Sequence, residues 1–494
     1  MESQEIRPEN LTDHPIIENK ELSLTEALIP IVALVIMLAY NVYVYGDSAT
    51  GGSNQFILLI GGAIAAMVGF RNKVKYHAMI EEVASNVKST TGALLILLLV
   101  GALSGTWLLS GVIPTMVYYG LQILSPAIFL PACLIICSII SISTGSSWTT
   151  SATVGIALIG IGSTIGMPLG MVAGAVVSGA YFGDKLSPLS DTTNLAPAMA
   201  GTDLFTHIRY MTYTTVPTMI LALILFSILG LYQTTDTLAD DGATLSAISG
   251  TFNVSPWLFL VPIIVIVLII RKTEPLVALL FGALLGGVFA LIFQPGIVAK
   301  VGGGDTLDFV SGYQGVLNAL TIQTQIETAD PMLNELFSAK GMQGMLSTIW
   351  LIICAMVFGG IMEAIGALSR ITKALVNTFQ SVFGLFASTV ASCLALNLTA
   401  SDQYLAIVVP GKMFAKAYKD KGLAPENLSR TLEDSATVTS PLIPWNTCGA
   451  YQSSVLGVST FAYLPYAFFN IISPFMTLLF AALRIKIKQL SQGH

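Results

Sequence analysis

The sequence predicts an all-α protein that crosses a membrane many times. It also predicts two inverted-topology repeats, with broken helices and re-entrant hairpins near the bilayer midplane. Charged residues make up 10% and hydrophobic residues 54% of the 494 positions, whereas a soluble domain carries about 25% charged residues. Residues 89–183 form a run of 95 positions without one charged side chain. Short polar motifs then recur about 250 residues apart, as described below.

The composition excludes several other classes of protein. Disorder requires low hydrophobicity and high charge, and this chain has the opposite. The net charge of −6 comes largely from an acidic N-terminus, so no basic patch points to a nucleic-acid partner. The five cysteines lie in or beside apolar segments without zinc-like spacing. We expect no catalysed reaction and no cofactor, and a lipid bilayer is the principal partner.

Apolar stretches long enough to cross a bilayer, which takes about 20 residues per helix, follow one another along the chain. They lie at about 27–45, 55–70, 93–109, 128–142, 152–165, 167–182, 211–231, 256–270, 275–293, 346–367, 374–396 and 461–483, with a short one at 404–409. This allows roughly 10 to 12 crossings. In residues 76–91, Met79, Val83 and Val87 recur every four positions opposite Glu81, Glu82 and Lys88, which predicts an amphipathic helix at the interface.

Lys and Arg predict the orientation, because short cytoplasmic loops are enriched in them. Basic clusters lie at 71–75, 271–272, 370–373, 412–430 and 484–488, whereas loops 46–54 and 233–255 contain no basic residue. An orientation that satisfies these clusters places both termini in the cytoplasm and requires an even number of crossings.

An internal repeat is visible in two pairs of segments. Ser143–Ser147 resembles Leu398–Asp402 at an offset of 255, and the Ser-Pro-Leu of residues 187–189 recurs at 440–442 at an offset of 253. The loop at 162–166 is uncharged, whereas its counterpart at 412–421 contains four lysines. The same position therefore faces opposite sides, as in the inverted repeats of secondary transporters.

These observations divide the chain into six parts. They are an acidic cytoplasmic tail (1–26), two N-terminal helices with the interfacial helix (27–90), the first inverted repeat (91–232), connecting helices with an external loop (233–343), the second inverted repeat (344–483) and a basic cytoplasmic tail (484–494).

Ionisable and hydroxyl-bearing residues within the apolar segments are the candidate site. An ionisable group inside a bilayer costs at least about 2.5–3.5 kcal/mol. Pro188, Pro441 and Pro444 interrupt helices, and bare carbonyls survive at membrane depth only inside protein or beside a cavity. Such oxygen ligands suit a hard cation such as Na⁺. The candidate ion-binding residues are Asp184, Asp191, Ser187, Thr192, Thr193 and Asn194 in the first repeat, and Glu363, Asp402, Asp434, Thr437, Ser440 and Asn446 in the second.

Asp184, Asp434 and Glu363 are the predicted direct ligands of Na⁺. The alternative is that these polar residues are helix caps at membrane edges, since Asp, Ser, Thr and Asn are favoured caps. This alternative is strongest for Glu433, which has Arg430 one turn away. Lys185 is expected to compensate a neighbouring acid.

Ion exchange would follow from competition at these carboxylates. Burial disfavours the charged form of a carboxyl group, so it holds a proton, and a bound cation drives the proton off. If the two occupancies are mutually exclusive and access alternates, the result is antiport of Na⁺ and H⁺. His207 is a candidate for tuning the pH dependence, and the alternative is an interfacial histidine beside Arg209.

Several motifs resemble the NhaC family of bacterial Na⁺/H⁺ antiporters. The most specific is GDKLSPLSDTTNLA at 183–196, with AYF before it and HIR at 207–209 after it, and SPLIPWNT at 440–447 and the segment 360–366 are also similar. The resemblance covers most of residues 25–485. It implies a multi-pass exchanger of the bacterial inner membrane, in the ion-transporter superfamily, whose paired re-entrant elements build a midplane site.

Rival functions remain open at this point. The family resembled also contains exchangers of malate and lactate coupled to Na⁺ and H⁺, so small carboxylates are a possible second class of substrate, and a homodimer is a possible assembly. The near absence of intramembrane Arg favours the cations. An intramembrane aspartyl protease is disfavoured, because Tyr181 replaces the first glycine of its Gly-x-Gly-Asp motif and the chain has no Tyr-Asp dipeptide. A simple channel fits two broken sites less well than alternating access.

Overall fold

The computed structural model describes residues 22–490 except 46–48, 50, 124, 233–240, 272, 329–333, 335, 336, 379 and 380. Most of the predicted acidic tail, 1–26, and residues 491–494 of the predicted basic tail lie outside this range. The described chain is helical apart from one pair of two-residue antiparallel strands, β1 (Thr324–Gln325) and β2 (Ser338–Ala339).

The prediction of a polytopic membrane protein is confirmed. Among the described residues, eight helices are long and apolar enough to cross a membrane, or up to ten if each of two bent helix pairs is one span. The bent pairs turn by 83° after Thr251 and by 53° after Tyr466. Broken helices are therefore part of the architecture, as the predicted fold class requires.

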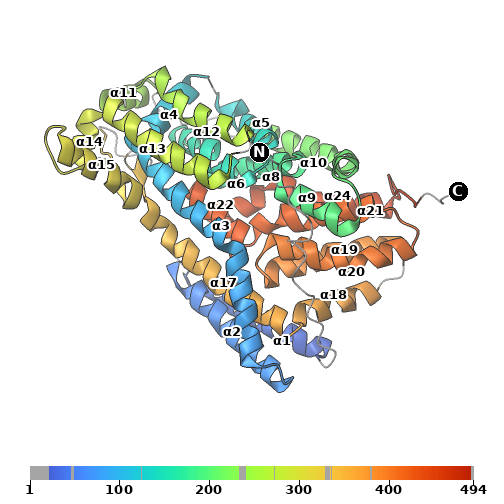
Figure 1. The fold of residues 1–494 in the computed structure, drawn as a ribbon. Helices are drawn as coiled ribbons and strands as arrows, with labels where there is room; N and C mark the ends of the chain where they lie inside the picture. The colour runs from blue at the N-terminus through green and yellow to red at the C-terminus, as the bar shows by residue number, and fades with distance from the viewer. Residues whose placement is uncertain are drawn as a thin grey trace, which may run out of the picture.

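Four long helices form one end of the molecule (Figure 1). They are α1 (Leu24–Tyr45), α2 (Ser53–Arg71), α3 (Tyr76–Leu109) and α17 (Leu346–Ala364). The helix α3 has 34 residues, so the stretch 76–91, which was expected to be a separate interfacial helix, continues into the span behind it. No proline interrupts this stretch, and a single glycine at 92 costs a helix only about 1 kcal/mol.

The helices of the first predicted repeat pack around α5 and α8. In chain order they are α4 (Val112–Ile123), α5 (Pro126–Thr144), α6 (Ser147–Thr150), the π-helical turn η3 (Ser151–Gly155), α7 (Ile156–Thr164), α8 (Leu169–Leu186), α9 (Asp191–Ala200) and α10 (Leu204–Tyr232). Helices α5 and α8 approach closely at Gly183, which has no Cβ. A Cβ there would lie 2.5 Å from the Ser138 carbonyl oxygen.

The connecting region forms a separate group of helices at the other end of Figure 1. Its elements are α11 (Asp241–Thr251), η4 (Pro256–Phe259), α12 (Leu260–Ile270), α13 (Pro275–Phe293), α14 (Pro295–Val301), α15 (Phe309–Thr321), β1, β2 and η5 (Met342–Met345). Of these, α13 packs along α3. This group positions the long α3 helix and contributes no candidate site residue.

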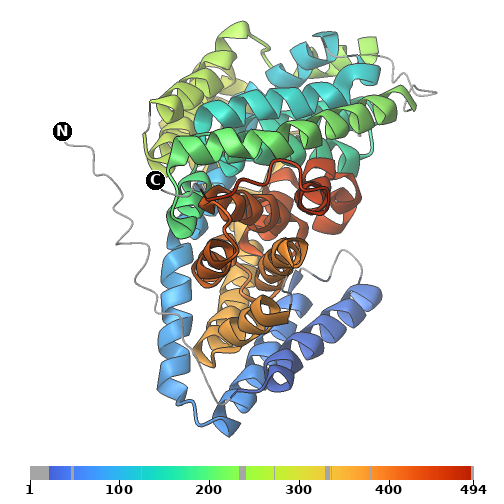
Figure 2. The same ribbon diagram turned by 90° about the vertical axis from the view of Figure 1, so that its right-hand side faces the viewer.

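The C-terminal helices form two layers, of which the later one packs against the first repeat. They comprise α18 (Ala367–Thr378), α19 (Val382–Thr399), α20 (Gln403–Asp420), α21 (Pro425–Leu432), the π-helical turn η6 (Glu433–Thr437), η7 (Ser440–Leu442), α22 (Thr447–Leu456), α23 (Thr460–Tyr463), η8 (Leu464–Tyr466) and α24 (Phe468–Ala482). Figure 2 shows the red helices between the green and teal helices on one side and the orange ones on the other, and α24 contacts α8, α10 and α19.

Candidate functional site

Two helices of the first repeat break beside each other. The first break follows α5, where Gly145 has a left-handed backbone with a φ of 71° and Ser146 caps the helix that starts with α6. The second break, residues 187–190, separates α8 from α9. A Cβ at Gly145 would lie 2.5 Å from the Cβ of Leu189. The two breaks are therefore in direct contact.

Polar side chains around the second break pair with the backbone that the break exposes. The Thr193 hydroxyl donates to the carbonyls of Asp184 and Lys185, at 3.1 Å each. The Asn194 amide donates to the carbonyls of Pro188 at 3.0 Å and Ser190 at 2.7 Å. Because buried carbonyls need partners, these predicted ligand residues stabilise the broken backbone.

Asp184 joins the two breaks. Its carboxylate accepts hydrogen bonds from the Ser147 backbone N–H at 3.1 Å and the Ser147 hydroxyl at 2.6 Å. Ser147 begins the continuous helical stretch through α6, η3 and α7, so the carboxylate lies at a helix N-terminus, where negative charge is stabilised. The Asp184 residue is 8% exposed. The carboxylate of Asp184 is thus held at the two breaks, where its oxygens can also bind a cation.

The second repeat contains a similar first break. Helix α19 ends at Thr399, Ser401 has a φ of 59°, and Asp402 caps α20. The Asp402 carboxylate accepts from the backbone N–H groups of Tyr404 at 2.8 Å and Leu405 at 3.0 Å. Left-handed backbone at a non-glycine residue is sparsely populated. The two backbone hydrogen bonds to the Asp402 carboxylate are the helix-capping geometry that was the alternative to a ligand role.

The second break of this repeat lies between η6 and α22. The Ser440 hydroxyl donates to the Thr437 carbonyl at 2.7 Å, and the Asn446 side chain accepts from the Cys448 N–H at 3.0 Å as the cap of α22. The Thr447 N–H donates to the Ser401 carbonyl at 2.9 Å. Both breaks of this repeat are consequently connected, as they are in the first.

One aromatic pair and one ion pair are among the contacts that join the two repeats. The rings of Trp148, in α6, and Tyr451, in α22, stack with centroids 4.0 Å apart, and the Tyr451 hydroxyl donates to the Trp148 carbonyl at 3.0 Å. Lys185 forms an ion pair with Asp434, and neither side chain is exposed. The expectation that Lys185 compensates an acid agrees with this pair, although the acid comes from the other repeat.

Asp434 has a full set of partners. Besides Lys185, its carboxylate accepts from the hydroxyls of Thr214 at 2.8 Å, Ser473 at 3.1 Å and Thr477. These donors lie on α10 and α24. A charged, buried carboxylate is stable when it is paired and hydrogen-bonded in this way. Asp434 is therefore an anchor between helices, and a cation could bind it only by displacing Lys185.

Glu433 is the intramembrane acid for which helix capping was the strongest alternative. Its residue is fully buried, neither carboxylate oxygen makes a well-formed hydrogen bond within the described residues, and the Thr437 hydroxyl is the donor beside it. Glu433 lies within electrostatic range of Asp184, Lys185 and Asp434. The Arg430 guanidinium, which suggested a simple surface pair, instead lies over the Tyr210 ring at 4.6 Å. The signal available in the sequence was that Glu433 and Asp434 are adjacent. Neighbouring residues of a helix point about 100° apart, so only one of the two can face Lys185.

The remaining candidates lie in or beside the second break of each repeat. Asp191 begins α9 at an exposed position within electrostatic range of Asp184, and the buried Thr192 hydroxyl contacts that of Ser190 at 3.2 Å. The Ser187 hydroxyl accepts from the Leu189 N–H at 3.3 Å. The Thr437 hydroxyl is fully buried beside Glu433.

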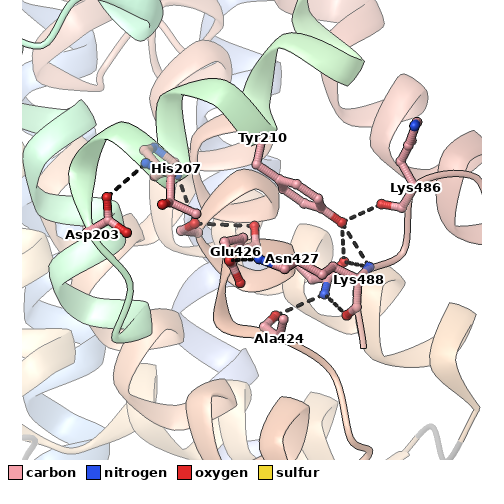
Figure 3. A network of polar contacts seen from close by, with 10 residues as sticks. Asp203, His207, Tyr210, Ala424, Glu426, Asn427, Lys486 and Lys488 are labelled. Atoms are coloured by element: carbon pink, nitrogen blue, oxygen red, sulfur yellow. Dashed lines mark hydrogen bonds and ion pairs between the residues drawn. The ribbon is translucent and has the colours of Figure 1, made fainter. Parts of the chain in front are cut away.

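Glu363 and His207 lie apart from the central acids. Glu363, in α17, is 9% exposed and has one carboxylate oxygen without a hydrogen-bond partner in the described chain. Its electrostatic neighbours are Glu82 and Asp402. His207 is fully buried, and its Nδ1 atom lies 2.8 Å from the Ser429 hydroxyl (Figure 3). The histidine is thus packed between α10 and α21 rather than exposed at a membrane edge.

Comparison with known proteins gives the family. The sequence model described as "Na+/H+ antiporter family" matches residues 179–485. The Na⁺/H⁺ antiporter NhaC of Alkalihalophilus pseudofirmus is 39% identical over 86% of this chain and 89% of its own length. The malate-2H⁺/Na⁺-lactate antiporter of Bacillus subtilis is 36% identical over 85% of this chain and 87% of its own. The NhaC antiporter of the same organism is 36% identical, over 80% and 85%. The chain belongs to the Na⁺/H⁺ antiporter family.

Proposed function

We propose that this protein exchanges Na⁺ for H⁺ by alternating access across the bacterial inner membrane, with both termini in the cytoplasm. The exchange takes place at Asp184 and Glu433, between the two pairs of helix breaks. Na⁺ and H⁺ occupy these carboxylates in turn. The family assignment and the similarity to two NhaC antiporters support the choice of ions.

The burial of Glu433 is the observation that carries this proposal. An ionised carboxylate without a partner is very costly inside a protein, so such a group holds a proton or a cation. No ion pair of the described chain matches the charge of Glu433, and the Thr437 hydroxyl is the neutral polar group beside it. Glu433 is therefore the acid whose charge state depends on a mobile ion, whereas the charge of Asp434 is matched by Lys185.

Asp184 supplies the second carboxylate and the surrounding oxygen ligands. The broken backbone beside it offers carbonyls, and Ser147 holds its carboxylate in place through two hydrogen bonds. The Thr437 hydroxyl is buried in the same π-helical turn as Glu433 and is the neutral ligand beside it. Such hard oxygen donors fit Na⁺ as the transported ion.

Exchange of an organic anion is the second candidate, because one relative is a malate-2H⁺/Na⁺-lactate antiporter. A carboxylate substrate would be favoured by an available buried cation at the site. The buried Arg430 guanidinium lies over the Tyr210 ring, and the Lys185 ammonium is bound by Asp434. This pairing favours the cation exchange over the anion exchange.

Purified protein in liposomes with an internal pH dye tests the proposal. We expect an imposed Na⁺ gradient alone to drive proton flux in the wild type. The Glu433→Gln variant keeps the shape and removes the titrating group, so we expect Na⁺-driven flux to fall to the level of empty liposomes. Glu81→Gln, the same change at an exposed position of α3, is the matched control and should retain flux.

Two results would contradict the proposal. Wild-type flux that requires malate or lactate and is absent with Na⁺ alone would establish the anion exchange instead. Normal Na⁺-driven flux in a folded Glu433→Gln variant would remove Glu433 from the site while leaving the transported ions unchanged.

A further inference from the structure

The last described residues of the chain fold back onto the helix that carries Glu433 and Asp434. We name residues 484–490 the C-terminal strap. Gln489 pairs with Leu423 in an antiparallel bridge. The Ala424 N–H donates to the Lys488 carbonyl at 3.0 Å, and the Leu490 N–H donates to the Gly422 carbonyl at 2.7 Å. The strap is thus attached to the loop immediately before α21.

Side chains of α21 extend this attachment along the helix. The Asn427 amide donates to the Lys488 carbonyl at 2.7 Å, and the Lys488 ammonium lies 2.5 Å from a carboxylate oxygen of Glu426. One turn later, the Arg430 guanidinium donates to the Lys486 carbonyl at 3.4 Å. Since α21 continues directly into η6, a displacement of α21 would move Glu433 and Asp434.

The strap also contacts α10. Figure 3 shows the Tyr210 hydroxyl between the strap and Asn427. It donates to the Asn427 carboxamide oxygen at 2.7 Å, contacts the Lys486 carbonyl, and accepts from the Lys488 N–H at 3.1 Å. One turn further along α10, Thr214 donates to Asp434. The strap itself is the continuation of α24, which supplies Ser473 and Thr477 to Asp434.

Three helices therefore meet twice, once inside the protein at Asp434 and once at their ends in the strap. We propose that the C-terminal strap is a clasp that holds α10, α21 and α24 as one rigid unit throughout transport, and that Tyr210 and Asn427 are positioning residues for the acids of η6. The clasp stays closed in every state of the cycle. This inference rests on the proposed exchange at Glu433.

Two substitutions test the positioning role. Asn427→Ala removes the amide that links α21 to the strap, and Tyr210→Phe removes only a hydroxyl. We expect each to raise the Na⁺ concentration for half-maximal proton flux by roughly fivefold, the size of a weak coupling between two sites, with a smaller change in maximal flux. Lys416→Ala, at an exposed position of α20, should change neither value. Unchanged Na⁺ dependence in both folded variants would overturn the positioning role.

Amide hydrogen exchange provides a readout that does not depend on the transported substrate. In Asn427→Ala we expect faster exchange across residues 425–437 and unchanged exchange in α5 and α8. Equal protection in wild type and variant would contradict the clasp. If the wild type transports a different substrate, the proposed function is wrong. The pattern of amide hydrogen exchange does not depend on that substrate and still tests the clasp.

A reversible cross-link tests whether the clasp stays closed. Leu423 and Gln489 are a non-hydrogen-bonded antiparallel pair. Such pairs have Cα atoms about 4.5 Å apart, which is within the range for a disulfide. We expect a Leu423→Cys/Gln489→Cys protein to transport at the same rate oxidised and reduced. Loss of flux on oxidation that is restored by dithiothreitol would show that the strap must open, and would refute the proposal.

Discussion

Lys185 and Asp434 are 249 residues apart in the chain and form an ion pair with no exposed side-chain surface. Each charge comes from a different predicted repeat. The pair is completed by hydroxyls of α10 and α24, so four segments of the protein depend on one carboxylate. The ion pair therefore connects the halves of the molecule beside the acids that we assign to ion exchange.

Replacing one partner of this ion pair should destabilise the protein more than replacing both. We expect Lys185→Met or Asp434→Asn alone to lower the free energy of unfolding by about 3–5 kcal/mol, because each leaves a buried charge unmatched. The double variant should regain most of this loss. Denaturant unfolding in detergent micelles measures all three, and losses that simply add in the double variant would contradict the pairing.

The stacked rings of Trp148 and Tyr451 predict a difference between two substitutions at one position. Tyr451→Phe keeps the ring and loses the hydrogen bond to the Trp148 carbonyl, which costs about 1 kcal/mol. Tyr451→Ala also loses the buried ring, which costs about 3–5 kcal/mol. Thermal unfolding of the purified variants gives the order, and equal losses would show that the hydroxyl alone connects the two broken helices.

The contact between the first-repeat breaks predicts unequal effects of two glycine substitutions. Both Gly145 and Gly201 have left-handed backbone, with φ of 71° and 85°, so alanine costs about 1–2 kcal/mol at either. A Cβ at Gly145 also meets Leu189 at 2.5 Å, whereas at Gly201 it meets nothing within 4 Å. We expect Gly145→Ala to be the more destabilising variant by denaturant unfolding. The reverse order would contradict the close contact.

The strap predicts a stability change at alkaline pH. The hydrogen bond to Glu426 raises the pKa of Lys488 above its ordinary value. A raised pKa in the folded state contributes stability below the unfolded value of about 10.4, and this stability is lost as the pH rises through the folded value. The difference in unfolding temperature between wild type and Lys488→Met should therefore shrink above pH 10.4 or so. A constant difference from pH 8 to 11.5 would contradict the ion pair.

Local features of the fold could be predicted from the sequence because their causes are local. Pro188 and Pro441 cannot continue a helical hydrogen-bond ladder, and Ser146 and Asn446 are residue types that cap helices. The structure has breaks at each of these places. The capping alternative could be stated for Asp402 on the same grounds, and the structure shows that capping bond.

The arrangement of the acids could not be predicted, because it depends on which way side chains of distant segments face. Glu433 and Asp434 are adjacent, and the sequence favoured Asp434 as the ion ligand. Their directions depend on a π-helical turn that no residue pattern announces. Arg430 was a plausible partner for Glu433 by spacing alone, yet it lies toward Tyr210 and the strap. Only the packing of α10, α21 and α24 decides between these pairings.

The ion pair between Lys185 and Asp434 also bears on how the protein is made. Domains are synthesised from the N-terminus, so the lysine is placed in its apolar surroundings before the ribosome reaches the aspartate. During that interval the first half holds a cation whose partner does not yet exist, at the cost that a lone charge has in a membrane. We expect the nascent first half to reach its final packing around Lys185 only when the second half supplies Asp434. Chains that stop before Asp434 retain an unmatched charge.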